Sequence, residues 1–148
     1  MRFTELEIQT EDIMWFAVDE CNHIFVCTSG GCGVIPEFVC RSREEAELLE
    51  EYFLTELVES TQESHVIQFE KTNSLIEDFR LLSRKGIFCF DVSMTPNCYS
   101  RRYIKYIEPV LPIRLECLPE RIQEIMADHR IPVDVSQSPY IDLKNDNI

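Results

Sequence analysis

The sequence predicts an α+β fold: a mainly antiparallel sheet with about three helices packed on one side. Two observations lead to this class. Apolar and aromatic runs typical of strands occur near the N-terminus and again after residue 86, and three other stretches have the spacing of amphipathic helices. The chain has 148 residues, of which 45% are hydrophobic. We therefore expect residues 1–148 to form a single domain with one core.

Two strands are expected at 14–19 and 23–28, where nearly every residue is apolar. The turn between them contains Asn22, a residue type that enters the left-handed backbone conformation more readily than most. Strands separated by so few residues most simply form a hairpin. Because both strands are apolar almost throughout, at least one of them is expected to be covered on both faces.

Three of the four glycines follow the second strand, at Gly30, Gly31 and Gly33. Glycines gathered in one place indicate unusual backbone angles or the close approach of another segment. A Walker phosphate-binding loop needs Lys-Ser/Thr after its last glycine, whereas residues 34–36 read Val-Ile-Pro, and GxGxxG is absent. We therefore interpret residues 29–33 as a structural turn.

The first helix is expected to begin after Ser42, because Ser42 and Glu45 have the spacing of a capping box. Its apolar residues recur at intervals of three and four, which defines one buried stripe. They are Ala46, Leu49, Phe53 and Leu57. The glutamates of this helix fall largely outside the stripe, so we expect them to form a solvated acidic ridge.

Two further helices are expected later in the chain. A capping-box pattern opens the second helix at Ser74, and basic residues followed by Gly86 close it. The third helix is expected to start at Leu118-Pro119, because proline suits the first helical turn.

The remaining strands are expected at 65–69, 86–92 and 101–109, with a turn signal at 95–97 between the last two. In the last strand, alternation places one set of residues on the same face. They are Arg101, Tyr103, Lys105 and Ile107. Neither face is purely apolar, which predicts a partly exposed sheet surface. Residues 145–147 are expected to be frayed.

The formal net charge is −13, and residues 1–80 hold the entire negative excess. Such a field repels nucleic acids and anionic membranes and attracts basic proteins, although acidity also serves ordinary solubility. We expect a protein partner rather than nucleic acid or membrane. The partner-binding residues are expected on the acidic ridge of the first helix. They are Glu44, Glu47, Glu50 and Glu51.

The seven cysteines contain no CxxC pair and match no standard zinc spacing. We expect them to be reduced and mostly to serve as small buried hydrophobes. They are Cys21, Cys27, Cys32, Cys40, Cys89, Cys98 and Cys117. The first four, together with His23, are five potential ligands within twenty residues, which leaves a metal site open as a minor alternative.

No local pattern predicts catalysis. Cys32 in the glycine turn is the thiol to test as a nucleophile, but no protease signature surrounds it. Asp19 and Asp91 are the carboxylates that a glycosidase-type site would pair, and the sequence does not fix their separation. We therefore expect no catalytic residue, no metal and no cofactor. The chain has no apolar run long enough to span a membrane and no signal-peptide pattern, so a cytoplasmic location is expected.

Residues 12–19 (DIMWFAVD) and 28–31 (TSGG), followed by Gly33, Pro36 and a serine-capped acidic helix, resemble a pattern in small bacterial immunity-like proteins. Those proteins accompany polymorphic or contact-dependent toxins. With a more degenerate part after residue 86, the pattern extends over roughly residues 12–126. The resemblance implies a cytoplasmic antidote that binds and blocks a cognate toxin, often a nuclease, without catalysis. It carries over no contact residues.

Two other classes of function stay open on the sequence. One is a structural or regulatory interaction module, or a homo-oligomer, that uses the sheet face around Arg101, Tyr103 and Lys105. The other is a small-ligand-binding or enzymatic domain built around the glycine turn.

Overall fold

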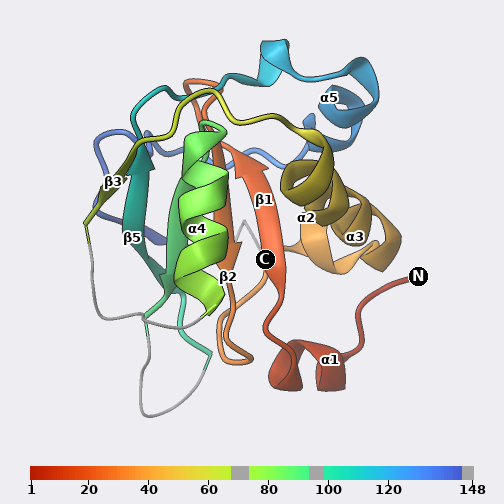
Figure 1. The fold of residues 1–148 in the computed structure, drawn as a ribbon. Coiled ribbons are helices and arrows are strands. Elements are labelled where there is room, and N and C mark those ends of the chain that lie inside the picture. The colour runs from red at the N-terminus through yellow and green to blue at the C-terminus, as the bar shows by residue number, and fades with distance from the viewer. Residues whose placement is uncertain (68–73, 94–98, 145–148) are drawn as a thin grey trace.

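The computed structural model describes residues 1–67, 74–93 and 99–144. It contains a sheet with the strand order β1-β2-β4-β5-β3, and β6 pairs with β5 as well (Figure 1). The strands are β1 (Met14–Val18), β2 (Ile24–Thr28), β3 (Ser64–Val66), β4 (Phe88–Val92), β5 (Arg102–Pro109) and β6 (Tyr140–Asp142). Among the strands of the described residues, only β2 and β4 are paired in parallel, so the prediction of a mainly antiparallel sheet in an α+β fold is confirmed.

Three helices pack on one face of the sheet, as expected from the sequence. They are α3 (Arg43–Glu51), α4 (Ser74–Arg84) and α5 (Glu120–Met126). Figure 1 shows α4 lying along the strands and α3 beside β1. The apolar core on this face includes Phe16 and Val26 of the first hairpin, Phe53, Phe79 of α4 and Ile122 of α5. Within the described residues, no helix has the length and apolarity needed to cross a bilayer.

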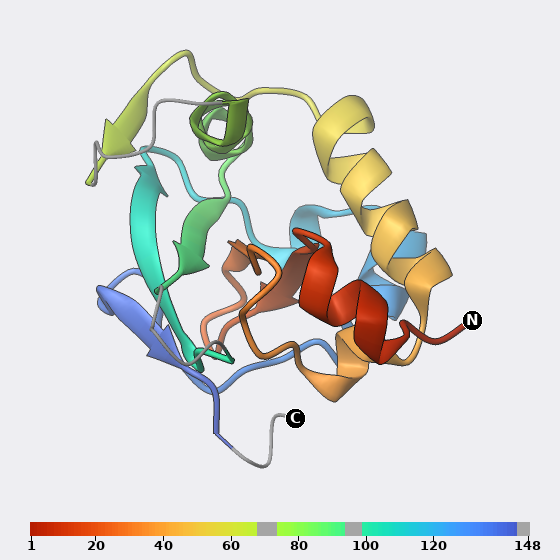
Figure 2. The same cartoon turned by 90° about the horizontal axis from the view of Figure 1, so that it is seen from below.

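A second apolar core covers the opposite face, so the first hairpin is buried on both sides, as expected. Trp15 and Phe25 belong to this second core. Two short helices that the sequence analysis missed lie near the N-terminus: α1 (Glu5–Thr10) and α2 (Glu37–Cys40). The turn of 3-10 helix η2 (Leu115–Cys117) precedes α5. Figure 2 shows from below that α1 and α2 lie on a different side of the molecule from α4.

The C-terminal segment closes this second face. The amide of Val18 donates to the carbonyl of His129 (2.8 Å), and the amide of Ile131 donates to the carbonyl of Val18 (2.9 Å). Further along, β6 pairs with residues 102–104 of β5. Between these contacts, Ile131 and Val135 are buried in the second core. The segment therefore touches the sheet both at β1 and at β5.

The start and end of α3 follow from side-chain chemistry. The hydroxyl of Ser42 accepts a hydrogen bond from the amide of Glu45 (3.2 Å), whereas the amide of Ser42 donates to Val39 and not to the Glu45 side chain. Only the serine half of the expected capping box therefore forms. The helix continues as a π-helical segment, η1 (Tyr52–Glu56). Buried Lys85 donates hydrogen bonds to the carbonyls of Phe53 (2.6 Å) and Leu54 (2.9 Å). These two carbonyls near the end of η1 therefore have a hydrogen-bond donor.

The predicted glycine turn is confirmed. Gly30 and Gly31 have φ values of 58° and 74°, in the left-handed region. A Cβ at Gly33 would overlap the hydroxyl of Tyr103, which packs directly against the turn. Asn22 in the hairpin turn is also left-handed, with φ 65°. Residues 95–97 and 145–147, for which a turn and a frayed end are expected, lie outside the described residues.

The prediction of a partly exposed sheet surface on β5 is confirmed for one face, where Arg102 is exposed and Ile104, Tyr106 and Glu108 are partly exposed. The other face of β5 is buried. Tyr103 and Lys105 are 0% and 4% exposed, because residues of the second core and the C-terminal segment cover them. The pairing register then shifts from Phe90–Lys105 to Cys89–Ile107, and this bulge moves Ile107 into the core on the helical face. Of the three residues on which an interaction module was expected to depend, only Arg101 is exposed. Of the strand expected at 65–69, residues 65–66 belong to β3, and residues 68–69 lie outside the described residues.

Candidate functional site

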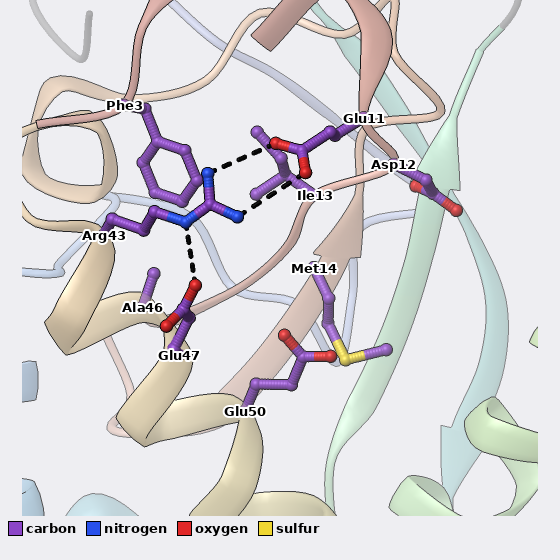
Figure 3. Close-up of a pocket in the computed structure, with 9 residues that line it drawn as sticks. All are labelled: Phe3, Glu11, Asp12, Ile13, Met14, Arg43, Ala46, Glu47 and Glu50. Atoms are coloured by element: carbon purple, nitrogen blue, oxygen red, sulfur yellow. Dashed lines mark hydrogen bonds and ion pairs between the residues drawn. The ribbon is translucent and has the colours of Figure 1, made fainter. Parts of the chain in front are cut away.

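An acidic pocket lies between α1, the start of β1 and α3 (Figure 3). The cavity has a volume of about 130 Å³. It is lined by Phe3, Glu11, Asp12, Ile13, Met14, Arg43, Ala46, Glu47 and Glu50. Four of these residues are carboxylates, and among the described lining residues Arg43 is the only cation. The pocket wall therefore carries a net negative charge.

Arg43 is surrounded by carboxylates. Its Nε donates to Glu47 (2.8 Å), and its two terminal nitrogens lie 3.4 and 3.5 Å from the oxygens of Glu11 (Figure 3). The guanidinium also forms an ion pair with Glu7. Phe3 lies beneath it, with 5.3 Å between the guanidinium carbon and the ring centroid. One positive charge thus faces three negative charges, so this cluster alone keeps a net charge of −2.

Glu50 faces further negative charge at the other end of the pocket. Burial raises its pKa, and the nearby carboxylates of Asp78, Glu47 and Asp12 raise it further. Burial also raises the pKa of Asp78 on α4. Among the described residues, no lysine or arginine forms an ion pair with Glu50, Asp78 or Asp12. An added cation would be favourable here because it would reduce the repulsion among the three carboxylates.

The four glutamates predicted to bind a partner separate into two positions. Glu44, Glu47 and Glu51 are exposed on the outer side of α3. Glu44 pairs with the N-terminal amine, and Glu47 pairs with Arg43. Glu50 is half-buried and points toward Met14 inside the pocket (Figure 3). A single continuous ridge therefore exists for three of the four residues, and their contact with a partner stays a prediction.

Several residues of the pocket were missed in the sequence because α1 was missed. Thr4 and Glu7 form a complete capping box: Thr4 Oγ1 accepts from the Glu7 amide (3.1 Å), and Glu7 Oε1 accepts from the Thr4 amide (2.8 Å). That spacing is readable in the sequence and indicates a helix start. The approach of Asp78 on α4 to Glu50 on α3 depends on tertiary packing and has no local signal.

A second cluster of ionisable groups lies at the turn of the first hairpin. It consists of Asp19, His23 and Asp134, whose potential ligand atoms all lie within 4.8 Å of one another. Asp19 is fully buried, and its Oδ1 accepts from the amides of Cys21 (2.9 Å) and His23 (2.7 Å). Its Oδ2 accepts from the amide of Val135 (2.9 Å). The carboxylate thus fixes the turn and holds it against the C-terminal segment.

The residues that the sequence offered for catalysis do not lie close together. Asp91 accepts a hydrogen bond from Thr28 at the end of β2 (2.6 Å), whereas Asp19 lies beside His23, before β2 begins. The two aspartates are therefore at opposite ends of the strand. Cys32 is buried in the glycine turn, also at the far end of β2 from His23.

Four of the described thiols are in environments that disfavour the thiolate. Burial raises the pKa of Cys27, Cys89 and Cys40. The pKa of Cys21 is also raised, by desolvation and by the carboxylates of Asp134 and Asp19. A raised pKa keeps a thiol protonated and weakens it as a nucleophile.

Comparison with known proteins found no family model that matches the chain, and no curated protein or solved structure similar to it. A functional proposal therefore depends on the geometry and charge of these two clusters and on the sequence pattern.

Proposed function

We propose that the chain is an immunity-like protein of the cytoplasm that neutralises a cognate protein toxin by binding a basic surface of that toxin, without catalysis. The observation that carries the proposal is the excess of carboxylates at the acidic pocket and along the outer side of α3. Around Arg43 and Glu50, the carboxylates outnumber the only cation of the described lining. The resemblance of residues 12–36 to the pattern of immunity-like proteins supports a toxin as the class of partner.

The pocket fits a basic side chain of a partner. A lysine or arginine that entered beside Glu50 would relieve the repulsion that Asp12 and Asp78 exert on Glu50. Glu44, Glu47 and Glu51 are exposed on α3, and exposed charges mainly guide the approach of a partner. This arrangement predicts fast, salt-sensitive association with a basic protein such as a nuclease.

The test uses the toxin domain encoded beside the gene. We would measure its association rate with the wild-type chain and with Glu44→Lys/Glu47→Lys/Glu51→Lys, over a range of salt concentrations. A loss of about tenfold or more at low salt is expected, because steering by opposite charge changes association rates on this scale. Rescue of toxin-expressing cells should weaken in parallel.

A matched control makes the same change of net charge elsewhere. Glu63, Glu120 and Glu124 are exposed and lie outside α3. Their triple substitution by lysine should lower the association rate less than the α3 triple variant does. Equal effects of the two triple variants would mean that only net charge matters and would reject α3 as the binding surface. Failure of the wild-type chain to bind or to protect would reject the immunity function itself.

A further inference from the structure

We propose that Asp19, His23 and Asp134 form a binding site for a divalent transition-metal ion, with Zn²⁺ the ion that these ligands fit best. The three residues come from the end of β1, the start of β2 and the C-terminal segment. Imidazole nitrogen favours zinc and neighbouring transition metals, and carboxylate oxygen completes many zinc sites. The site is separate from the acidic pocket and independent of the proposed toxin binding.

The spacing of the best-defined pair suits a shared metal. His23 Nδ1 lies 3.2 Å from Asp19 Oδ2. Two ligand atoms that each lie about 2.1 Å from a tetrahedral zinc ion are about 3.4 Å apart. The ion would replace the proton between these atoms and would need little movement of either side chain. The ligand atom of Asp134 lies within 4.8 Å of both, so a small side-chain rotation would complete a three-ligand set.

The ligands are held in place by a second layer of hydrogen bonds. The amides of Cys21, His23 and Val135 fix the Asp19 carboxylate. Asp134 Oδ1 accepts from the amide (3.0 Å) and hydroxyl (2.6 Å) of Ser136. In the described part of the chain, the other oxygen of Asp134 makes no hydrogen bond. Such outer contacts orient carboxylate ligands and reduce the entropy lost when an ion binds.

The cluster also has access to solvent and a suitable charge. Asp19 is completely buried, whereas His23 is 14% exposed and Asp134 is half-buried. The ring of His23 is supported by Phe88, with 5.3 Å between centroids. Two carboxylates and a neutral imidazole carry a charge of −2, which a divalent ion neutralises. Water would occupy the fourth position on the exposed side.

Binding at this site would join the hairpin turn to the C-terminal segment. Asp134 already lies beside Val135, whose amide donates to Asp19, and the amide of Glu20 donates to the carbonyl of Val133 (3.0 Å). An ion held by both segments binds the folded chain and not the unfolded one. The melting temperature should therefore rise with ion concentration.

The test uses tag-free protein, freed of metal by a chelator and kept reduced. Zn²⁺ and Co²⁺ are titrated by calorimetry, and the Co²⁺ complex is followed by its absorption spectrum. One ion per chain is expected. His23→Gln and Asp134→Asn should each weaken binding about tenfold or more, since even loss of an outer-layer contact costs about 10–100-fold. His23 is 14% exposed and hydrogen-bonded to buried Asp19, so the melting temperature of each variant in chelator is measured as well, to separate a loss of stability from a loss of ion affinity.

His65→Gln is the matched control, because His65 is exposed on β3 and lies outside the cluster. It should bind the ion as the wild-type chain does. No uptake of either ion by the wild-type chain would overturn the proposal. So would uptake that His23→Gln leaves unchanged. A Co²⁺ spectrum with a thiolate charge-transfer band would also overturn it, because it would assign the ion to cysteines.

Discussion

Substitution of Gly33 by alanine tests why the turn after β2 contains a glycine. Gly33 has no positive φ, so alanine brings no backbone strain, and its cost is steric. Its Cβ would overlap the Tyr103 hydroxyl and would lie 2.9 Å from Tyr103 Cζ and 3.0 Å from Val92 Cγ2. Overpacking of this kind costs about 1–3 kcal/mol.

A double-mutant cycle with Tyr103→Phe isolates the hydroxyl. Tyr103→Phe alone removes two hydrogen bonds, the one that the hydroxyl donates to the Val34 carbonyl (2.9 Å) and the one that it accepts from Trp15 Nε1 (3.4 Å), at a cost of about 1–2 kcal/mol. In that background Gly33→Ala should cost about 1 kcal/mol less than in the wild-type chain, because the worst overlap is gone. The relief should be partial, since Val92 and the ring carbon remain close.

Urea unfolding followed by Trp15 fluorescence measures the cycle, because Trp15 is the only tryptophan and its ring centroid lies 5.4 Å from that of Tyr103. Gly30→Ala is the control: Gly30 has φ 58° and faces Val92, so Tyr103→Phe should not change its cost. If Gly33→Ala costs the same free energy of unfolding in both backgrounds, close packing against the hydroxyl does not explain this glycine.

Three further predictions concern buried charge. Lys85→Met should lower the free energy of unfolding by about 2 kcal/mol in urea titrations, because two buried carbonyls at the end of η1 lose their donor; an unchanged midpoint would contradict this role. Burial lowers the pKa of His129, so the unfolded chain takes up more protons, and stability should fall as pH decreases below about 6.5. In thermal melts over this pH range, the melting temperature of His129→Gln should fall less steeply with decreasing pH than that of the wild type. The melting temperature of the exposed-site variant His65→Gln should follow the wild type. Glu50→Gln should stabilise the chain at neutral pH, because burial and neighbouring carboxylates raise the pKa of Glu50 and disfavour its charged form. That gain in stability should shrink as pH falls through the folded-state pKa of Glu50. A gain independent of pH would refute the explanation by the charge of Glu50.

Local chemistry made part of the fold predictable. Ser42 caps α3, Asn22 takes the left-handed conformation that its turn requires, and the glycine turn has the predicted backbone angles. Each of these features depends on a few neighbouring residues. The same kind of signal at Thr4 and Glu7 marks the start of α1, which shows that a readable pattern was overlooked there.

Long-range packing made the rest unpredictable. Lys105 reads as a solvent-facing residue in an alternating strand, but packing across the second core buries it, with Phe88 and Phe90 beside its ammonium. The cluster of Asp19 with Asp134 joins residues more than a hundred positions apart, and no local pattern links them. The acidic ridge was predictable as one face of a helix, whereas the inward orientation of the Glu50 side chain depends on where α4 packs.

The contact of residues 129–142 with both β1 and β5 has a consequence for biosynthesis. These residues leave the ribosome after β1 to β5. A nascent chain that has not reached residue 129 therefore exposes the backbone amide and carbonyl of Val18 at the end of β1, which pair with His129 and Ile131 in the folded protein. Unpaired strand backbone is a template for association with other chains. Premature termination before this point should therefore yield aggregates rather than a smaller folded protein.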